Sequence, residues 1–292
     1  MLAASIPHRA QADPPEAAAP VRLVTLRLPL QAADIGTSQA IIGRAVDQLA
    51  STPNEGRQRP TLVIEFAASP RDDSAGRGST FADAVKLARF LQGPEVAAVK
   101  TVAYLPRTVT GHAVLAALAC DEIAIAPEAE FGDAAADEAP ERPVGPGMVS
   151  IYEEVAANRG NVPTAVAASL VDAQTEVLRV ETEDSIEFVP RDGVDGLRAT
   201  KTIVAQEVLT PAGATALFSG RQARELGFAR FLAPNRAALA RALQTTVDSL
   251  EEDQSLLADW RPVMIDLQGP VTPRVKQRIS SLIGGEIDSA GV

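Results

Sequence analysis

The sequence is poor in the residues that make disulfides, metal sites and membrane spans. Its single cysteine, Cys120, excludes an intrachain disulfide. Its two histidines, His8 and His112, exclude a site with several histidine ligands, and no CxxC or HExxH pattern occurs. No apolar run approaches the ~18 residues that cross a bilayer. We therefore expect no metal and no cofactor, and we interpret Cys120 as a small core residue rather than a reactive thiol.

Lysine is scarce as well. Lys86, Lys100, Lys201 and Lys276 are the only four, and none lies between residues 101 and 200. Acidic residues outnumber basic ones by 38 to 27, which gives a net charge of −11. An acidic chain repels phosphate backbones, so nucleic acid is not expected as a partner. With 292 residues, 46% of them hydrophobic, the chain is long enough for one large core or two ordinary ones.

The centre of the chain is predicted to be a strand, a buried helix and a second strand. The strand at 100–105 ends at Pro106 and is followed by an apolar, alanine-rich segment, 108–120, which favours a helix packed at close range. Residues 121–126 are predicted to form the second strand, and 130–132 to turn the chain. This pattern is typical of the middle of an α/β layer.

Strands and helices also alternate before this centre, with strands expected at 21–28, 61–66 and 96–105 and helices at 37–50 and 80–91. Ser79 is the expected N-cap of the second helix. Because strand, helix and strand repeat in order, the sheet is predicted to be parallel.

After the centre we expect helices at 147–158, 163–171, 219–228 and 235–250, and a hairpin at 174–190. The hairpin is predicted to turn at Glu183-Asp184, and Ser219 and Gly227 frame the third helix as its cap and stop.

The two ends of the chain differ from its middle. Residues 1–20 are either the stub of an export signal, with Ala10-Gln11-Ala12 resembling a cleavage site, or a disordered tail rich in alanine and proline. An exported or membrane-associated location is favoured over a cytoplasmic one. Residues 21–248 form the main predicted domain, and 249–292 a linker with one further strand and helix. That last unit cannot bury its apolar face alone, so either the chain is a fragment or the unit packs on another surface.

The central segment resembles a known superfamily. Residues 111–132 resemble the central unit of the ClpP/crotonase superfamily. The similarity lies in Gly111-His112-Ala113, in Cys120-Asp121 and in the residues that follow up to Phe131-Gly132. It is most similar to the membrane-bound ClpP-class serine proteases of the NfeD and signal-peptide-peptidase-A type. The segment at 219–228 resembles the closing element of these proteins. The resemblance spans about 21–233 and, more weakly, 260–285.

The resemblance implies an α/β fold, a ββα spiral with a mostly parallel sheet, followed by the opening unit of a second copy. It also implies self-association into homo-oligomers and a peptide or protein segment as the partner. Contact with a membrane would come only through segments outside this sequence.

The family's catalytic parts are not found at their matching positions. Gly111 stands where the family has its serine nucleophile. Thr110, one residue away, is either a displaced nucleophile or the N-cap of the following helix. The family's lysine base would fall near Arg142 or Pro143, and arginine stays protonated at ordinary pH.

The loop that supplies oxyanion donors in the family has changed too. Its paired glycines are replaced after Ser69-Pro70 by Arg71-Asp72, which bring two charged side chains to that place. His112 is the one titratable group next to the position that matches the family's nucleophile. It is either a general base oriented by Asp133 or Asp137, or a residue of the first helical turn that partly faces a pocket.

The backbone N–H groups of His112 and Ala113 are predicted to open at a helix N-terminus. Together with Gly111, Ser69 and Arg71 they are the candidate residues for binding a carboxylate or a peptide carbonyl.

Three functions follow from these residues. The first is a non-catalytic domain that binds or assembles. The second is an active serine-type endopeptidase with a relocated nucleophile. The third is a crotonase-type acyl-CoA enzyme, because the Ala-Cys-Asp segment is shared across the superfamily.

Overall fold

The computed structural model describes residues 19–53, 58–68, 76–138, 144–253 and 256. The chain divides into two compact units, Met1–Leu256 and Leu257–Val292, and all described residues belong to the first. The predicted strand and helix of a second copy, and almost all of the leader, lie outside the described residues.

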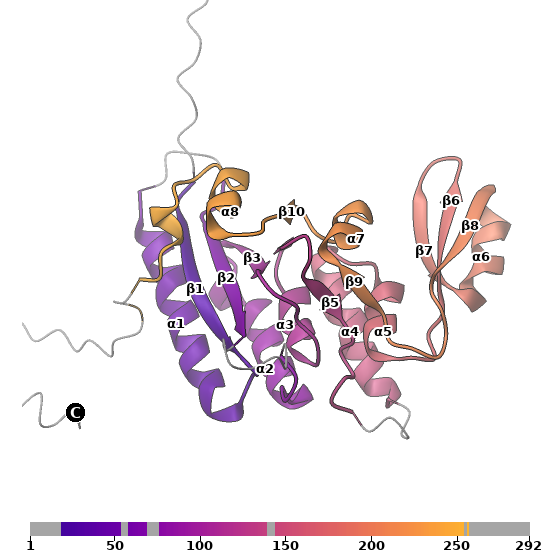
Figure 1. Ribbon diagram of the computed structural model, residues 1–292, viewed down its shortest axis with the longest axis horizontal. Coiled ribbons are helices and arrows are strands. Elements are labelled where there is room, and N and C mark those ends of the chain that lie inside the picture. The colour runs from indigo at the N-terminus through magenta and orange to yellow at the C-terminus, as the bar shows by residue number, and fades with distance from the viewer. Residues whose placement is uncertain (1–18, 54–57, 69–75, 139–143, 254–255, 257–292) are drawn as a thin grey trace, which may run out of the picture. The chain divides into compact units, whose positions relative to one another are not determined.

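The first unit is built on a five-stranded parallel sheet in the order β1-β2-β3-β4-β10 (Figure 1). Its strands are β1 (Val21–Leu28), β2 (Thr61–Ala68), β3 (Lys100–Leu105), β4 (Glu122–Ile125) and β10 (Phe231–Leu232). The predicted α/β class with a mostly parallel sheet is therefore confirmed. Neighbouring residues of β2, such as Val63 and Ile64, are both buried, as expected for a sheet covered on both faces.

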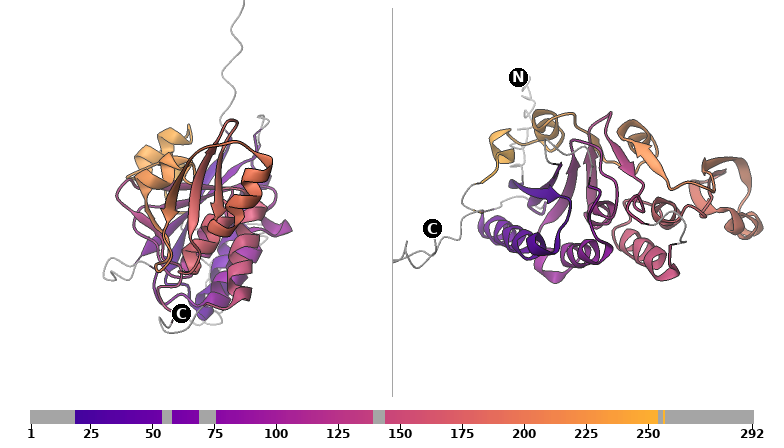
Figure 2. Two further views of the ribbon diagram at one scale, coloured as in Figure 1. Left: turned by 90° about the vertical axis from the view of Figure 1, so that its right-hand side faces the viewer. Right: turned by 60° about the horizontal axis from the view of Figure 1, so that its bottom comes forward.

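Helices cover one face of this sheet and a shorter segment covers the other. The large core cluster joins alternate strand residues to α1 (Ala32–Ser51), α2 (Phe81–Leu91), α3 (Ala113–Leu118), α4 (Pro146–Arg159) and α5 (Thr164–Val171). Figure 2 shows α1 and α2 side by side beneath the sheet. The intervening strand residues, Leu23, Val63 and Val102 among them, pack against α8 (Arg236–Ala242) and the 3₁₀ turn Asp248–Leu250.

Several element boundaries differ from prediction. α1 begins at Ala32 rather than 37, and β3 begins at Lys100 because Pro94–Val96 forms a 3₁₀ turn. α8 ends at Ala242 rather than 250. The N-cap of α2 is Thr80, whose hydroxyl accepts the Asp83 N–H.

Ser79, the predicted cap, instead ties the loop before α2 to the segment after β1. Its hydroxyl accepts from Leu30 N (2.8 Å) and donates to the Gly76 carbonyl (2.7 Å). A hydroxyl that is 2% exposed and satisfied in this way has no part in the helix cap.

Residues 130–132 were expected only to turn the chain, but they form a strand. β5 (Glu130–Gly132) pairs antiparallel with β9 (Leu217–Ser219), which leads into α7 (Gly220–Glu225). The two strands approach closely: a Cβ atom placed at Gly132 would lie 2.2 Å from the Ala216 carbonyl oxygen. The pairing partner lies more than 80 residues away, so no local pattern announces it. The predicted cap of α7 is confirmed as a capping box between Ser219 and Gln222.

A second sheet, antiparallel and three-stranded, occupies residues 177–210. It contains β6 (Val177–Thr182), β7 (Ile186–Pro190) and β8 (Ile203–Thr210), in the order β7-β6-β8, with the turn Arg191–Gly193 and α6 (Val194–Thr200) between β7 and β8. The predicted hairpin is confirmed as β6 and β7, but β8 and α6 were not predicted.

Candidate functional site

Gly111 lies where the loop after β3 enters α3, and its backbone geometry needs glycine. Its φ is +66°, in the left-handed region that L side chains rarely adopt. Its N–H donates to the Asp133 carbonyl (3.0 Å), so the loop is fixed against the segment after β5. A Cβ atom placed at Gly111 would lie 2.9 Å from Oδ2 of Asp137, which is closer than such contacts occur.

The Asp137 carboxylate is held beside Gly111 by a second loop. Gly78 N–H donates to Asp137 Oδ2 at 2.6 Å. Three segments thus meet at one point: the loop before α2, the entry to α3, and the turn after β5. The space next to Gly111 is occupied by a carboxylate of the protein itself.

His112 is buried at the same place and both of its ring nitrogens are engaged. Nε2 lies 2.9 Å from Oε1 of Glu138, and Nδ1 lies 3.0 Å from the hydroxyl of Tyr152. Burial, and secondarily the Glu138 charge, raise the pKa of Tyr152 well above its usual value, so Tyr152 stays protonated. One ring nitrogen of His112 therefore contacts a carboxylate, and the other contacts a phenolic hydroxyl that keeps its proton.

This geometry corrects two expectations for His112. The carboxylate that contacts it is Glu138, not Asp133 or Asp137. The side chain does not face a pocket: it is 1% exposed and packs against the Phe81 ring, whose centroid lies 5.3 Å away. Among the described residues no serine, threonine or cysteine hydrogen-bonds to the imidazole, so His112 has no nucleophile to activate there.

Thr110 does not cap α3. The N-cap is His112, and it makes no capping side-chain hydrogen bond, so the N-cap interpretation of Thr110 is wrong. Thr110 is 8% exposed, and its carbonyl oxygen lies 2.8 Å from where a Cβ of Gly76 would be, which shows how closely the two loops approach.

The other candidate binding residues divide into two groups. Ala113 opens α3, is fully buried, and lies next to His112. Ser69 and Arg71 lie outside the described residues, as do Arg142 and Pro143. Asp137 and Glu138, from the turn at 133–138, lie against Gly111 and His112.

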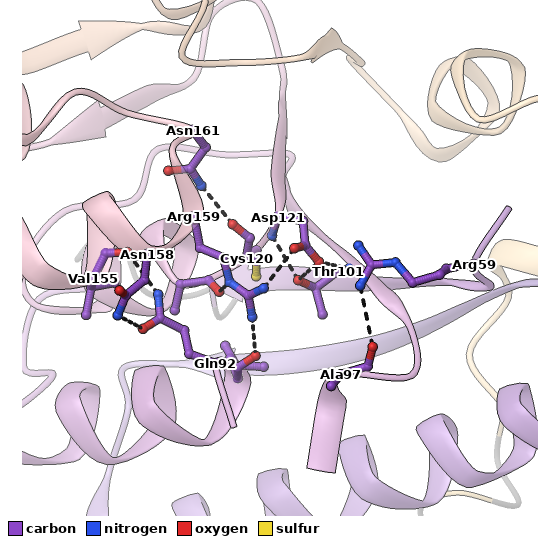
Figure 3. A network of polar contacts seen from close by, with 12 residues as sticks. Arg59, Gln92, Ala97, Thr101, Cys120, Asp121, Val155, Asn158, Arg159 and Asn161 are labelled. Atoms are coloured by element: carbon purple, nitrogen blue, oxygen red, sulfur yellow. Dashed lines mark hydrogen bonds and ion pairs between the residues drawn. The ribbon is translucent and has the colours of Figure 1, made fainter. Parts of the chain in front are cut away.

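The opposite end of α3 is held by Arg159, the last residue of α4 (Figure 3). Its guanidinium donates to the carbonyls of Ala119 (2.7 Å) and Leu91 (2.5 Å) and to Oδ1 of Asp121 (2.8 Å). Asp121 in turn accepts from the N–H and hydroxyl of Thr101. A cation therefore satisfies the carbonyls that two helices leave unpaired at their C-termini.

Cys120 lies within this network, and its thiol is unreactive. It is completely buried, and burial raises the pKa of its thiol to about 12, so no thiolate forms at neutral pH. The interpretation of Cys120 as a core residue agrees with this environment.

Within the described ranges, no group of three or more potential ligands is arranged to hold a metal ion. None of the helices in those ranges combines the length and the apolar character that a bilayer span requires.

No protein-family model matches the chain, and no curated protein matches it. Among solved structures it is similar to a mutant of the 1510-N membrane-bound stomatin-specific protease, with a TM-score of 0.43, 11% identity, and coverage of 80% of this chain and 91% of that chain. It is similar to the 1510-N membrane protease specific for a stomatin homolog from Pyrococcus horikoshii, with a TM-score of 0.41, 12% identity, and coverage of 76% and 77%.

A third similar structure is an enoyl-CoA hydratase/isomerase family protein from Hyphomonas neptunium, with a TM-score of 0.42, 16% identity, and coverage of 77% of this chain and 70% of that chain. At these identities and TM-scores, nothing about activity or site residues follows from the similarity.

The side chains that surround Gly111 were only partly foreseen. Asp137 was named as a neighbour of His112 but lies against Gly111 and Gly78 instead. Glu138 and Tyr152 were missed, because one lies in an acidic loop and the other on an apolar helix face. The only available signal was that a buried histidine needs polar partners for both nitrogens.

Proposed function

We propose that the chain is a non-catalytic domain with a ClpP-class serine-protease fold, and that it acts by binding or assembly. The observation that carries the proposal is the Asp137 carboxylate beside Gly111, anchored on Gly78 N–H at 2.6 Å. A hydrolase of this kind needs an oxygen nucleophile there and free N–H donors for the oxyanion. A carboxylate in that space repels a developing oxyanion and takes up a donor.

The available bases support the same proposal. His112 is committed to Glu138 and Tyr152. Of the three described lysines, Lys100 pairs with Glu122, Lys201 pairs with Glu187, and Lys86 is exposed on α2. Without a base next to a hydroxyl, a serine-type mechanism has no route for the proton.

Under this proposal the partner is a peptide or protein segment, or a further copy of the chain, and a complete second domain elsewhere would carry any hydrolysis. Nucleic acid is not proposed as a partner, since the net charge of −11 opposes it.

A fluorophosphonate probe tests the proposal directly. The folded chain should remain unlabelled under conditions that label an active serine hydrolase completely, and a fluorogenic peptide library should show no turnover above buffer. Labelling that disappears in Thr110→Val, with folding unchanged by circular dichroism, would overturn the proposal in favour of a displaced nucleophile. Calorimetry with an acyl-CoA is the second arm, because saturable binding would favour the crotonase-type function instead.

A further inference from the structure

The antiparallel sheet at 177–210 presents an edge strand to solvent. In the order β7-β6-β8, strand β8 pairs only with β6 within the described residues (Figure 1). Residues 204–208 are all exposed, and they include Val204 (63%) and Val208 (47%), two of the large apolar side chains with high exposure in the described ranges. An edge of this kind offers unpaired N–H and C=O groups as well as apolar side chains.

The other sheet edges in the described residues are short, covered or blocked. β1 is bridged at Leu23 by Glu252, and Arg22 pairs with Asp253. β10 has two residues. β7 ends at Pro190, which has no N–H to donate. β8, with eight residues and no proline or lysine, has only its two register shifts against β6 as protection.

The sequence of β8 is complementary to itself in the antiparallel direction. Its ladder to β6 is regular from Ala205 to Val208, and Gln206 lies within that stretch. Two copies related by a two-fold axis at Gln206 would set Val204 against Val208 of the other copy, twice, and glutamine against glutamine. An amide side chain both donates and accepts, so two glutamines can pair with each other. A closed two-fold interface of this kind uses the same patch on both copies.

Charge also permits this pairing. The one charged residue of β8, Glu207, is already paired with Arg179 of β6 at 3.1 Å. In the two-fold register it lies opposite Ala205, so the two glutamates do not face each other. Like charges directly opposite each other destabilise a sheet pair, and this register avoids them.

We propose that β8 is a self-association surface, on which a second copy of this chain adds its own β8 antiparallel, centred on Gln206, to make one continuous six-stranded sheet. The inference deepens the assembly role in the proposed function because it names the surface on which a further copy binds, and it holds whether or not the chain hydrolyses peptides. The regular stretch is short and the net charge of −11 per copy is repulsive, so the dimer is weak and strengthens with salt.

A charge-swap series measured by sedimentation velocity tests the register. In the dimer, Val204→Lys alone sets each lysine against an unchanged valine of the other copy, and Val208→Glu alone does the same with a glutamate. Each variant also brings two like charges close to the two-fold axis. Each should raise the dimer Kd about tenfold or more. The double variant V204K/V208E sets each new lysine against a new glutamate of the other copy, and should restore most of the lost affinity. Circular dichroism confirms that all variants stay folded.

Cross-linking gives an independent readout. Gln206→Cys on the two-fold axis should form an intermolecular disulfide under mild oxidation, because opposite residues in an antiparallel pair have Cα atoms ~4.5–5.5 Å apart. Asp195→Cys on α6, whose native side chain is 92% exposed, is the matched control and should form far less. The buried Cys120 does not contribute to either reaction.

A chain that stays monomeric to roughly 100 μM at 0.5 M salt would overturn the inference, since even weak biological contacts form in that range. So would a dimer that is indifferent to both single valine variants, because its interface would then lie elsewhere. Neither result bears on the probe labelling that tests the proposed function.

Discussion

The two ends of helix α3 are held by opposite charges. At the C-terminal end, Arg159 satisfies the carbonyls of Ala119 and Leu91 and pairs with Asp121. At the N-terminal end, the carboxylates of Asp137 and Glu138 lie against Gly111 and His112. Both arrangements complement the helix dipole, which is positive at the N-terminus and negative at the C-terminus.

The two ends of α3 differ in the groups that these charged side chains contact. The arginine serves backbone carbonyls that any α3 would leave unpaired, so it is part of the scaffold. The carboxylates contact a buried glycine and a buried histidine at the entry to α3. The contacts at one end therefore serve the backbone, whereas those at the other end bring carboxylates against the residues that begin the helix.

Removing the cation at the C-terminal end should have the largest effect. Arg159→Met deletes three hydrogen bonds and leaves the Asp121 carboxylate without its cationic partner. The loss is costly because both side chains are only about one-fifth exposed. We expect a loss of about 3–5 kcal/mol in the free energy of unfolding, measured by urea denaturation. Arg198→Ala, which breaks a pair on the surface of α6, is the control and should change stability by less than about 0.5 kcal/mol. A loss at Arg159 no larger than the control would remove the claim that this end is scaffold.

At the N-terminal end, breaking the His112 network should cost somewhat less. His112→Leu leaves the fully buried hydroxyl of Tyr152 without its partner, and should lower stability by about 2–3 kcal/mol. Adding Tyr152→Phe removes the orphaned hydroxyl, so the double variant should be no less stable than His112→Leu alone. Additive losses in this double-mutant cycle would show that the two side chains act independently.

Placing a side chain at Gly111 should cost about 1–2 kcal/mol, because φ is +66° and a Cβ would crowd Asp137. Removing the carboxylate as well, in G111A/D137A, should recover the crowding part and leave only the backbone strain. Thermal unfolding of the unmodified chain and of these two variants measures this. If Gly111→Ala is neutral, the space beside it is not filled as the structure has it.

Cys120 provides the smallest effect and a pH dependence. Its pKa is raised from 9.0 in the unfolded chain to about 12 in the folded one, so the unfolded state releases the proton first as pH rises. The contribution of Cys120 to stability should therefore be constant below about pH 8 and fall above it, by about 1.4 kcal/mol between pH 8 and pH 10. Cys120→Ala should lose this part of the slope in urea denaturation and keep only a smaller fall near pH 10, because burial also raises the pKa of Tyr104 and Tyr152. An equal slope in the variant would assign the effect to other groups.

The local pattern of apolar and polar residues was sufficient to predict the position of the strands and helices that bury a continuous face. β1, β2, α3 and the capped helix α7 are where their apolar runs and capping residues predict them. It was insufficient where pairing partners are distant in sequence. Glu130–Gly132 becomes a strand only because Leu217–Ser219 lies beside it, and β8 exists only through its ladder to β6.

The candidate site shows the same limit. The glycine at 111 is visible in the sequence, and so is the shortage of lysine. That Asp137 would fill the space beside it, and that Glu138 and Tyr152 would engage His112, depends on how the turn at 133–138 and helix α4 pack on the entry to α3.

The sequence by itself determined the α/β layer, the burial of the central helix and the glycine at 111, because periodicity and residue identity are local properties. Only the tertiary structure decided which carboxylates close the N-terminal end of α3, which cation holds its other end, and which strand is left at an open edge. Those outcomes depend on contacts between segments that are dozens of residues apart, and no periodicity in the chain encodes such contacts directly.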